Sequence, residues 1–116
     1  MDPVALVGLA RTLIDIDSTS GHEHDASAWL AEWLRSRGYE VVEQPVADNR
    51  FNVIATLDPP EVVFSTHIDC VPPFFPSREE DGVLYGRGAC DAKGILAAQL
   101  AALERLHAGG ERRVGV

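Results

Sequence analysis

Three side chains of the kind that bind metals or transfer protons lie in two short stretches of the sequence. His67 and Asp69 end the stretch VVFSTHID, and Asp91 lies further along in YGRGACDAKG. Residues i and i+2 of a strand point to the same side, so His67 and Asp69 should leave the strand together. A carboxylate beside a metal-binding histidine fixes its tautomer and raises its basicity. The same pair could also serve as half of a proton relay.

Each of these residues also has a purely structural interpretation. His67 could hydrogen-bond within the core, and Asp69 could cap a turn before Pro72 and Pro73. Asp91 begins a predicted helix, where a carboxylate caps free N–H groups and meets a favourable helix dipole. Convergence of three polar groups from two elements favours a metal site, but the residues alone leave the structural alternative open.

The glycine-rich turn YGRGACDAKG also has features of a phosphate-binding loop. A dinucleotide loop needs its third glycine where this chain has Asp91, and that carboxylate would repel the phosphate. A P-loop needs glycine, lysine and a hydroxyl residue in succession, whereas Ala92 precedes Lys93 and Gly94 follows it. Nucleotide binding at this turn is therefore the least favoured hypothesis.

The elements predicted around these residues would place them at one edge of a sheet. The pattern of apolar residues predicts helices over residues 3–17, 23–37 and 92–107. It predicts strands over residues 39–46, 51–57 and 62–69, with another beginning at Arg113. The succession of strand, loop, helix and strand is a βαβ unit, which predicts parallel pairing. Sites in such sheets lie at the carboxyl ends of strands, where His67 falls, and at the amino ends of the helices that follow, where Asp91 falls.

Two further expectations concern burial. Leu96, Leu100, Leu103 and Leu106 form a helical stripe that should face the core. Residues 22–24, His-Glu-His, are neighbours on a helix and cannot all turn to one ion, so we expect a solvated helix start there.

Composition limits the partners of the chain. It has 116 residues, 46% of them hydrophobic, which suits one small packed domain. The net charge of −8 disfavours nucleic acid and anionic membranes. Cys70 and Cys90 lack the spacing of a redox pair or a zinc ribbon, and no segment has the pattern of a leader or a membrane span. We expect a reduced, cytoplasmic protein with no nucleic-acid or membrane partner.

The two stretches together resemble the paired motifs of a known enzyme family. STHIDCVPP followed by LYGRGACDAKGILAAQLAALERL is similar to the co-catalytic zinc aminoacylase and exopeptidase family. That family includes acetylornithine deacetylases, succinyl-diaminopimelate desuccinylases and carboxypeptidase G-like enzymes. IDSTSGHE fits its start. The resemblance implies an α/β fold, the N-terminal part of an α/β/α sandwich with a mixed, largely parallel sheet. Residues 1–116 would be the N-terminal portion of a catalytic domain, without the smaller dimerisation or lid domain.

The resemblance also implies roles for individual residues. His67 would bind one metal ion, Asp91 would bridge two, and Asp69 would orient His67 and tune the site as a catalytic residue. The metals would be two zinc ions, with cobalt or manganese as alternatives. They would activate water to hydrolyse the amide bond of an N-acyl amino acid or small peptide.

The resemblance further implies a homodimeric parent enzyme. The general-base glutamate and the remaining ligands would lie beyond Val116, so we expect this segment to be inactive. The alternative is a non-catalytic binding module that keeps the fold.

Overall fold

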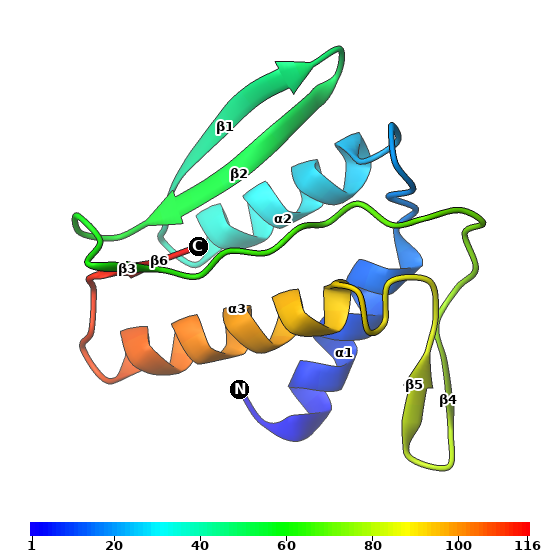
Figure 1. Cartoon of the computed structure of the whole chain (residues 1–116). Helices are drawn as coiled ribbons and strands as arrows, with labels where there is room; N and C mark the ends of the chain where they lie inside the picture. The colour runs from blue at the N-terminus through cyan, green and yellow to red at the C-terminus, as the bar shows by residue number, and fades with distance from the viewer.

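The computed structural model describes all residues from 1 to 116 and consists of three helices and six short strands (Figure 1). The helices are α1 (Pro3–Asp15), α2 (His24–Ser36) and α3 (Lys93–Ala108). The strands are β1 (Glu40–Ala47), β2 (Arg50–Thr56), β3 (Val62–Val63), β4 (Arg78–Glu80), β5 (Val83–Tyr85) and β6 (Val114–Gly115). The three predicted helices are thus present, with bounds that differ from the prediction by one or two residues.

Local sequence signals set the ends of α1. A carboxylate oxygen of Asp2 accepts a hydrogen bond from the N–H of Ala5 at 2.8 Å, and Pro3 occupies the first helical position. The helix ends at Ile16, whose backbone is extended (φ −91°, ψ 117°). The carbonyl group of Ile16 therefore points away from the helical hydrogen-bond ladder and can accept a bond from elsewhere.

All three helices pack into one hydrophobic cluster. Its 11 buried members are Leu9, Ala10, Leu13, Leu30, Leu34, Tyr39, Ala55, Leu96, Ala97, Leu100 and Leu103. Since α1, α2 and α3 contribute to the same cluster as Ala55 of β2, these residues form one helical layer against the strands. The prediction for Leu106 is wrong, because its side chain is 38% exposed. The last α3 residue in the cluster is Leu103, so the final turn of α3 has no core to pack on.

The strands pair in three separate ways. β1 and β2 form an antiparallel hairpin, β4 and β5 form another, and β3 pairs with β6 in parallel. The parallel pair with α3 between its strands confirms the predicted βαβ unit. Val116 also exchanges backbone hydrogen bonds of 2.7 and 3.0 Å with Ala55, which places β6 between β2 and β3. The mixed α/β fold is confirmed, and within these residues the sheets are small and partly parallel.

Two segments differ from their predicted structure. The strand predicted over residues 62–69 pairs only at Val62 and Val63, and residues 64–69 continue as an extended segment outside any ladder. Residues 78–80, for which no strand was predicted, form β4. Asp81 and Gly82 between β4 and β5 have φ of 52° and 76°, the positive values that a tight hairpin turn requires.

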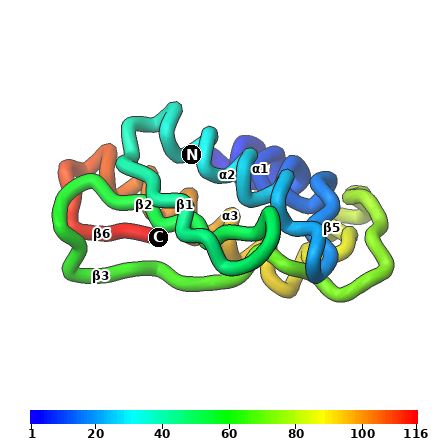
Figure 2. The backbone as a smooth tube through the Cα atoms, turned by 90° about the horizontal axis from the view of Figure 1, so that it is seen from above, coloured from blue at the N-terminus to red at the C-terminus, as the bar shows by residue number.

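The molecule is flat, with principal extents of 38 × 38 × 21 Å. In the view from above, the C-terminus lies between β2 and β3, beside β6 (Figure 2). None of the helices combines the length and the apolar character that a membrane-spanning helix needs.

The single core predicts a contrast between two leucines of α3. Leu100 is fully buried, so Leu100→Ala should lower the free energy of unfolding by about 2–5 kcal/mol through lost burial and a cavity. Leu106→Ala, the matched control on the same helix, should cost less than about 1 kcal/mol because Leu106 is already exposed. Urea unfolding followed by circular dichroism measures both. Equal losses would mean that the core does not end at Leu103.

Candidate metal site

The structure brings His67 and Asp91 into direct contact. The imidazole Nε2 of His67 lies 2.8 Å from a carboxylate oxygen of Asp91. His67 comes from the extended segment after β3, and Asp91 directly precedes Ala92, the residue that caps α3. Two elements that are distant in sequence therefore present one nitrogen and one oxygen donor to the same point.

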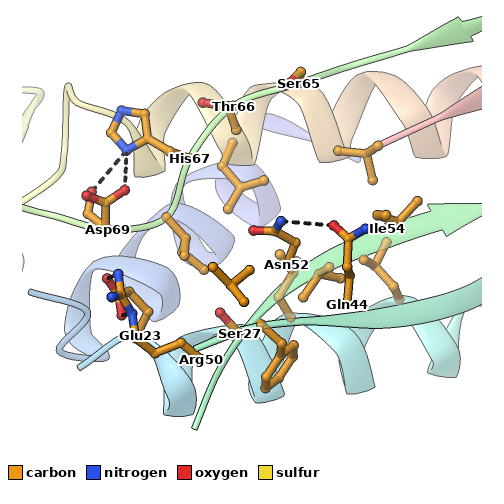
Figure 3. Close-up of a pocket in the computed structure, with 18 of the residues that line it drawn as sticks. Glu23, Ser27, Gln44, Arg50, Asn52, Ile54, Ser65, Thr66, His67 and Asp69 are labelled. Carbon is orange, nitrogen blue, oxygen red and sulfur yellow. Dashed lines mark hydrogen bonds and ion pairs between the residues drawn. The ribbon is translucent and has the colours of Figure 1, made fainter. Parts of the chain in front are cut away.

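Asp69 occupies the other side of the same imidazole. The Nδ1 atom of His67 lies 3.0 Å from the backbone carbonyl of Asp69 and 3.2 Å from its carboxylate (Figure 3). The hydroxyl of Ser20 donates to the second carboxylate oxygen of Asp69 at 3.3 Å. A hydrogen bond from Nδ1 to Asp69 fixes the ring and its tautomer, and this leaves Nε2 as the atom that faces Asp91.

These neighbours alter the acidity of His67. Partial burial lowers the pKa of the imidazole, but the Asp69 carbonyl and the Asp91 carboxylate outweigh burial, so the pKa lies above its ordinary value. The cause is that both ring nitrogens face acceptors, which favours the form with a proton on each nitrogen.

The donor types of this pair fit zinc, but their number is small. Zinc binds imidazole nitrogen and carboxylate oxygen, and catalytic sites usually supply three protein ligands. No group of three His, Cys, Asp or Glu side chains in the structure is arranged to hold a metal ion. The Asp91 side chain is 84% exposed, so its second oxygen is accessible to solvent. His67 and Asp91 could thus form part of a centre that other residues complete.

A short bridge to the segment after α1 holds His67 and Asp69 in place. Thr19 pairs in parallel with Cys70, whose N–H donates to the carbonyl of Ser18 at 3.0 Å. The hydroxyl of Ser18 donates to the carbonyl of Ile68 at 2.7 Å. These bonds hold Ile68 and Cys70, the residues on either side of Asp69. The segment after α1 therefore fixes the backbone position from which the His67 side chain extends.

The glycine-rich turn packs against the same place. Gly88 has φ +86°, and a Cβ atom there would lie 2.5 Å from the Cys70 sulfur. Lys93 is only 1% exposed, and its ammonium donates to the carbonyl of Ile16 at 2.6 Å. Burial lowers the pKa of Lys93, against the opposing influence of Cys70 and the two aspartates of residues 15–17. The lysine of the turn is therefore buried and is not available to a phosphate.

Glu23 corrects one prediction from the sequence. It is 6% exposed, and its carboxylate accepts two hydrogen bonds from Arg50, at 2.8 and 2.9 Å, and one from the N–H of Gly21 at 2.9 Å. The predicted solvated start of α2 is therefore wrong for Glu23, although His22 is exposed. Burial raises the pKa of Glu23, but the Gly21 N–H and the Arg50 guanidinium outweigh it and hold the pKa below its ordinary value.

A groove of about 610 Å³ runs from this site along the strands (Figure 3). β2 lines one side and residues 63–69 line the other, with Leu30, Leu34 and Leu96 among the lining residues. The N–H groups of residues 65–69 donate to no protein atom. Residues 65–69 therefore line the groove with their side chains and also carry unpaired backbone donors, as the residues of an open strand edge do.

Comparison with known proteins places this site in a family. Residues 63–116, which contain His67, Asp69 and Asp91, match the sequence model of a family described as peptidase family M20/M25/M40. These residues belong to the M20 peptidase family. The predicted resemblance to an exopeptidase family is confirmed at the level of the M20 family.

Relatives extend the similarity over nearly the whole chain. A probable carboxypeptidase of Aspergillus clavatus is 41% identical over 127 aligned residues, which cover 96% of this chain and 28% of the relative. A peptidase M20 domain-containing protein of Schizosaccharomyces pombe is 39% identical over 116 aligned residues. The alignment covers 95% of this chain and 29% of that protein. The chain thus spans less than a third of the length of these two relatives.

Solved structures share the fold. A tripeptidase from Staphylococcus aureus superposes with a TM-score of 0.82 at 24% identity, covering 99% of this chain and 35% of the tripeptidase. Human carnosine dipeptidase 1 gives a TM-score of 0.75 at 25% identity over 97% of this chain and 30% of the dipeptidase. The arrangement of α1, α2, α3 and the strands therefore recurs in these two peptidases.

The groove predicts a pattern of amide exchange. The N–H groups of residues 65–69 should exchange fast because they have no protein acceptor. Those of Phe64 and Cys70 should exchange more slowly, since they donate to Gly115 at 2.8 Å and to Ser18 at 3.0 Å. Hydrogen exchange followed by NMR measures this difference. Protection of residues 65–69 equal to that of Phe64 would mean that another strand fills the groove.

The buried Glu23 carboxylate predicts a pH-dependent contribution to stability. A pKa below the ordinary value of 4.5 means that this contribution is complete above pH 4.5 and disappears as the pH falls through the lower folded-state pKa. Glu23→Gln should therefore cost about 1–3 kcal/mol at pH 7 and progressively less in acid. Unfolding by urea at several pH values measures the difference.

Glu79→Gln is the control for this prediction. It removes the Arg11–Glu79 ion pair, whose side chains are 41% and 50% exposed, and should cost less than about 1 kcal/mol. A cost of Glu23→Gln that stays constant from pH 7 to pH 3 would show that the carboxylate charge contributes nothing.

Proposed function

We propose that this chain supplies two metal ligands, His67 and Asp91, to a hydrolase that cleaves amide bonds in small peptides or N-acyl amino acids. The observation that carries the proposal is the 2.8 Å distance between Nε2 of His67 and a carboxylate oxygen of Asp91. Both residues lie within the segment that matches the M20 family. The names of the relatives, probable carboxypeptidases among them, favour peptides within that substrate class.

Each residue of the site has a distinct task in this proposal. His67 would bind the metal through Nε2 after that nitrogen loses its proton, because Asp69 accepts the hydrogen bond from Nδ1. Asp91 presents one oxygen beside His67 and keeps the other free, so it can bridge two ions. Zinc, when bound, lowers the pKa of water and polarises the amide carbonyl. Asp69, which accepts a hydrogen bond from Ser20, would hold the imidazole in the orientation that metal binding needs.

Two ligands are fewer than catalytic zinc usually takes, so the proposal requires further donors and a base for water from residues outside these 116. We therefore expect the 116-residue chain alone to bind zinc weakly and to lack hydrolytic activity. Zinc, rather than cobalt or manganese, remains part of the proposal, as do a homodimeric assembly and a cytoplasmic location.

A non-catalytic member of the family is the rival function. The absence of a third converging ligand within the chain favours it. The two proposals differ in one measurable property, because only the hydrolase requires that metal binding and turnover disappear together when Asp91 changes.

Replacement of Asp91 in the whole gene product tests the proposal. Asp91→Asn keeps the shape but removes the charge, and it should lower zinc affinity and hydrolysis each by more than about 100-fold, since even outer partners of zinc ligands cost 10–100-fold. Metal analysis and hydrolysis of dipeptides and N-acyl amino acids measure the two effects. Chelation should abolish the same activity.

Asp81→Asn is the matched control. Asp81 lies in the turn between β4 and β5 with φ 52°, a conformation that asparagine adopts readily, so the variant should keep both zinc and activity. Hydrolysis that survives chelation, or that persists in Asp91→Asn, would exclude the metal mechanism. If Asp91→Asn loses zinc but the unaltered protein already shows no hydrolysis, the result would favour the non-catalytic rival.

A further inference from the structure

Lys93 is the most deeply buried charged residue of the chain, and neither the metal site nor the core explains it. Its side chain is 1% exposed, less than that of any other charged residue. It follows Asp91 by two residues and begins α3. Burial of an ammonium group is costly unless the group has hydrogen-bond or charged partners. The partners of Lys93 should therefore indicate the role of its charge.

The partner of Lys93 is the end of α1. Its ammonium donates to the carbonyl of Ile16, the residue that caps α1, at 2.6 Å. Carbonyl groups at a helix C-terminus carry partial negative charge, and Asp15 and Asp17 on either side of Ile16 add to it. The carboxylates of Asp15 and Asp17 bond to Ser77 and Thr19, respectively, so the direct bond of Lys93 is to the backbone.

The residues that follow Ile16 are hydrogen-bonded to the segment that contains His67. Ser18, two residues later, donates to the carbonyl of Ile68 at 2.7 Å and accepts from the N–H of Cys70 at 3.0 Å. Lys93 therefore reaches from the element that carries Asp91 to the element that positions His67. It connects the segment that carries Asp91 to the segment that carries His67 through residues 16–18, which directly follow α1.

The turn before Lys93 packs closely against Lys93 and Cys70. The N–H of Lys93 donates to the carbonyl of Gly88 at 2.8 Å. A Cβ atom on Gly88 would lie 3.3 Å from Cδ of Lys93 and 2.5 Å from the Cys70 sulfur. Asp91 lies between Gly88 and Lys93, so both ends of its short segment are fixed against neighbouring atoms.

We propose that Lys93 is a positioning residue for the candidate metal site, whose buried ammonium holds Asp91 beside His67, where the two side chains could bind the same metal ion. This inference rests on the proposed function of His67 and Asp91 as metal ligands. Lys93 itself touches neither metal nor substrate.

Zinc titration of the 116-residue chain by NMR tests the role of Lys93. The amide signals near His67 and Asp91 report binding of Zn²⁺ alone at pH 7, for the unaltered chain and for Lys93→Met, which keeps the length of the side chain but removes the charge. Lys93→Met should bind Zn²⁺ about 10–100-fold more weakly, as expected for a residue that supports a ligand from outside the site.

Leu103→Ala separates positioning from general loss of stability. Leu103 lies on α3, is 2% exposed and is remote from Asp91 in sequence, so Leu103→Ala should destabilise the fold without changing Zn²⁺ affinity. Unchanged affinity in Lys93→Met, or an equal loss in Leu103→Ala, would overturn the positioning role. If Lys93→Met does not fold, Lys93→Gln takes its place with the same expected loss, and unchanged affinity there would overturn the role as well.

Asp91→Asn distinguishes failure of this inference from failure of the proposed function. If Asp91→Asn loses the zinc response while Lys93→Met keeps it, only the role of Lys93 is wrong. If Asp91→Asn binds Zn²⁺ as the unaltered chain does, the metal site is elsewhere, and that result overturns both.

Discussion

The structure depends on close packing of three chain segments around the Cys70 side chain. The end of α1, residues 68–70 and the turn that precedes α3 meet there with no room to spare. A Cβ atom on Gly88 would collide with the Cys70 sulfur at 2.5 Å, and one on Gly94 would collide with the carbonyl of Ala89 at 2.2 Å. Because backbone atoms and a buried sulfur form these contacts, they cannot yield as exposed side chains do. The separation of His67 from Asp91 follows from this junction.

Local patterns in the sequence predicted the helices well, because helical structure and its ends depend on nearby residues. Asp2 and Pro3 mark the start of α1, and the leucines of α3 up to Leu103 lie in the core as their spacing indicates. Leu106 fits the same spacing but is exposed, since spacing defines a helix face and not how far its neighbours extend. The βαβ connection also followed from the order of elements.

The candidate site was only partly predictable, and the difference lies in sequence distance. His67 and Asp91 could be brought together because a general rule places strand ends beside the start of the next helix. No such rule links Glu23 with Arg50, 27 residues away, or Lys93 with the Ile16 carbonyl, 77 residues away. Glu23 lay in a run of polar residues that is ordinarily solvated, and a lysine at the start of a helix gives no sign of burial.

The extended segment after β3 shows why a strand pattern does not by itself make a strand. Its apolar run correctly indicated extended backbone, but a ladder requires a partner on at least one side, and pairing is a property of other residues. Beyond Phe64 the N–H groups of residues 65–69 have no protein acceptor, and yet His67 has a defined place. That place is defined at the end of the segment, where Cys70 pairs with Thr19 and Ser18 binds Ile68. The site is therefore anchored at the end of α1, and a partner along the groove could pair with the free donors while this anchor stays intact.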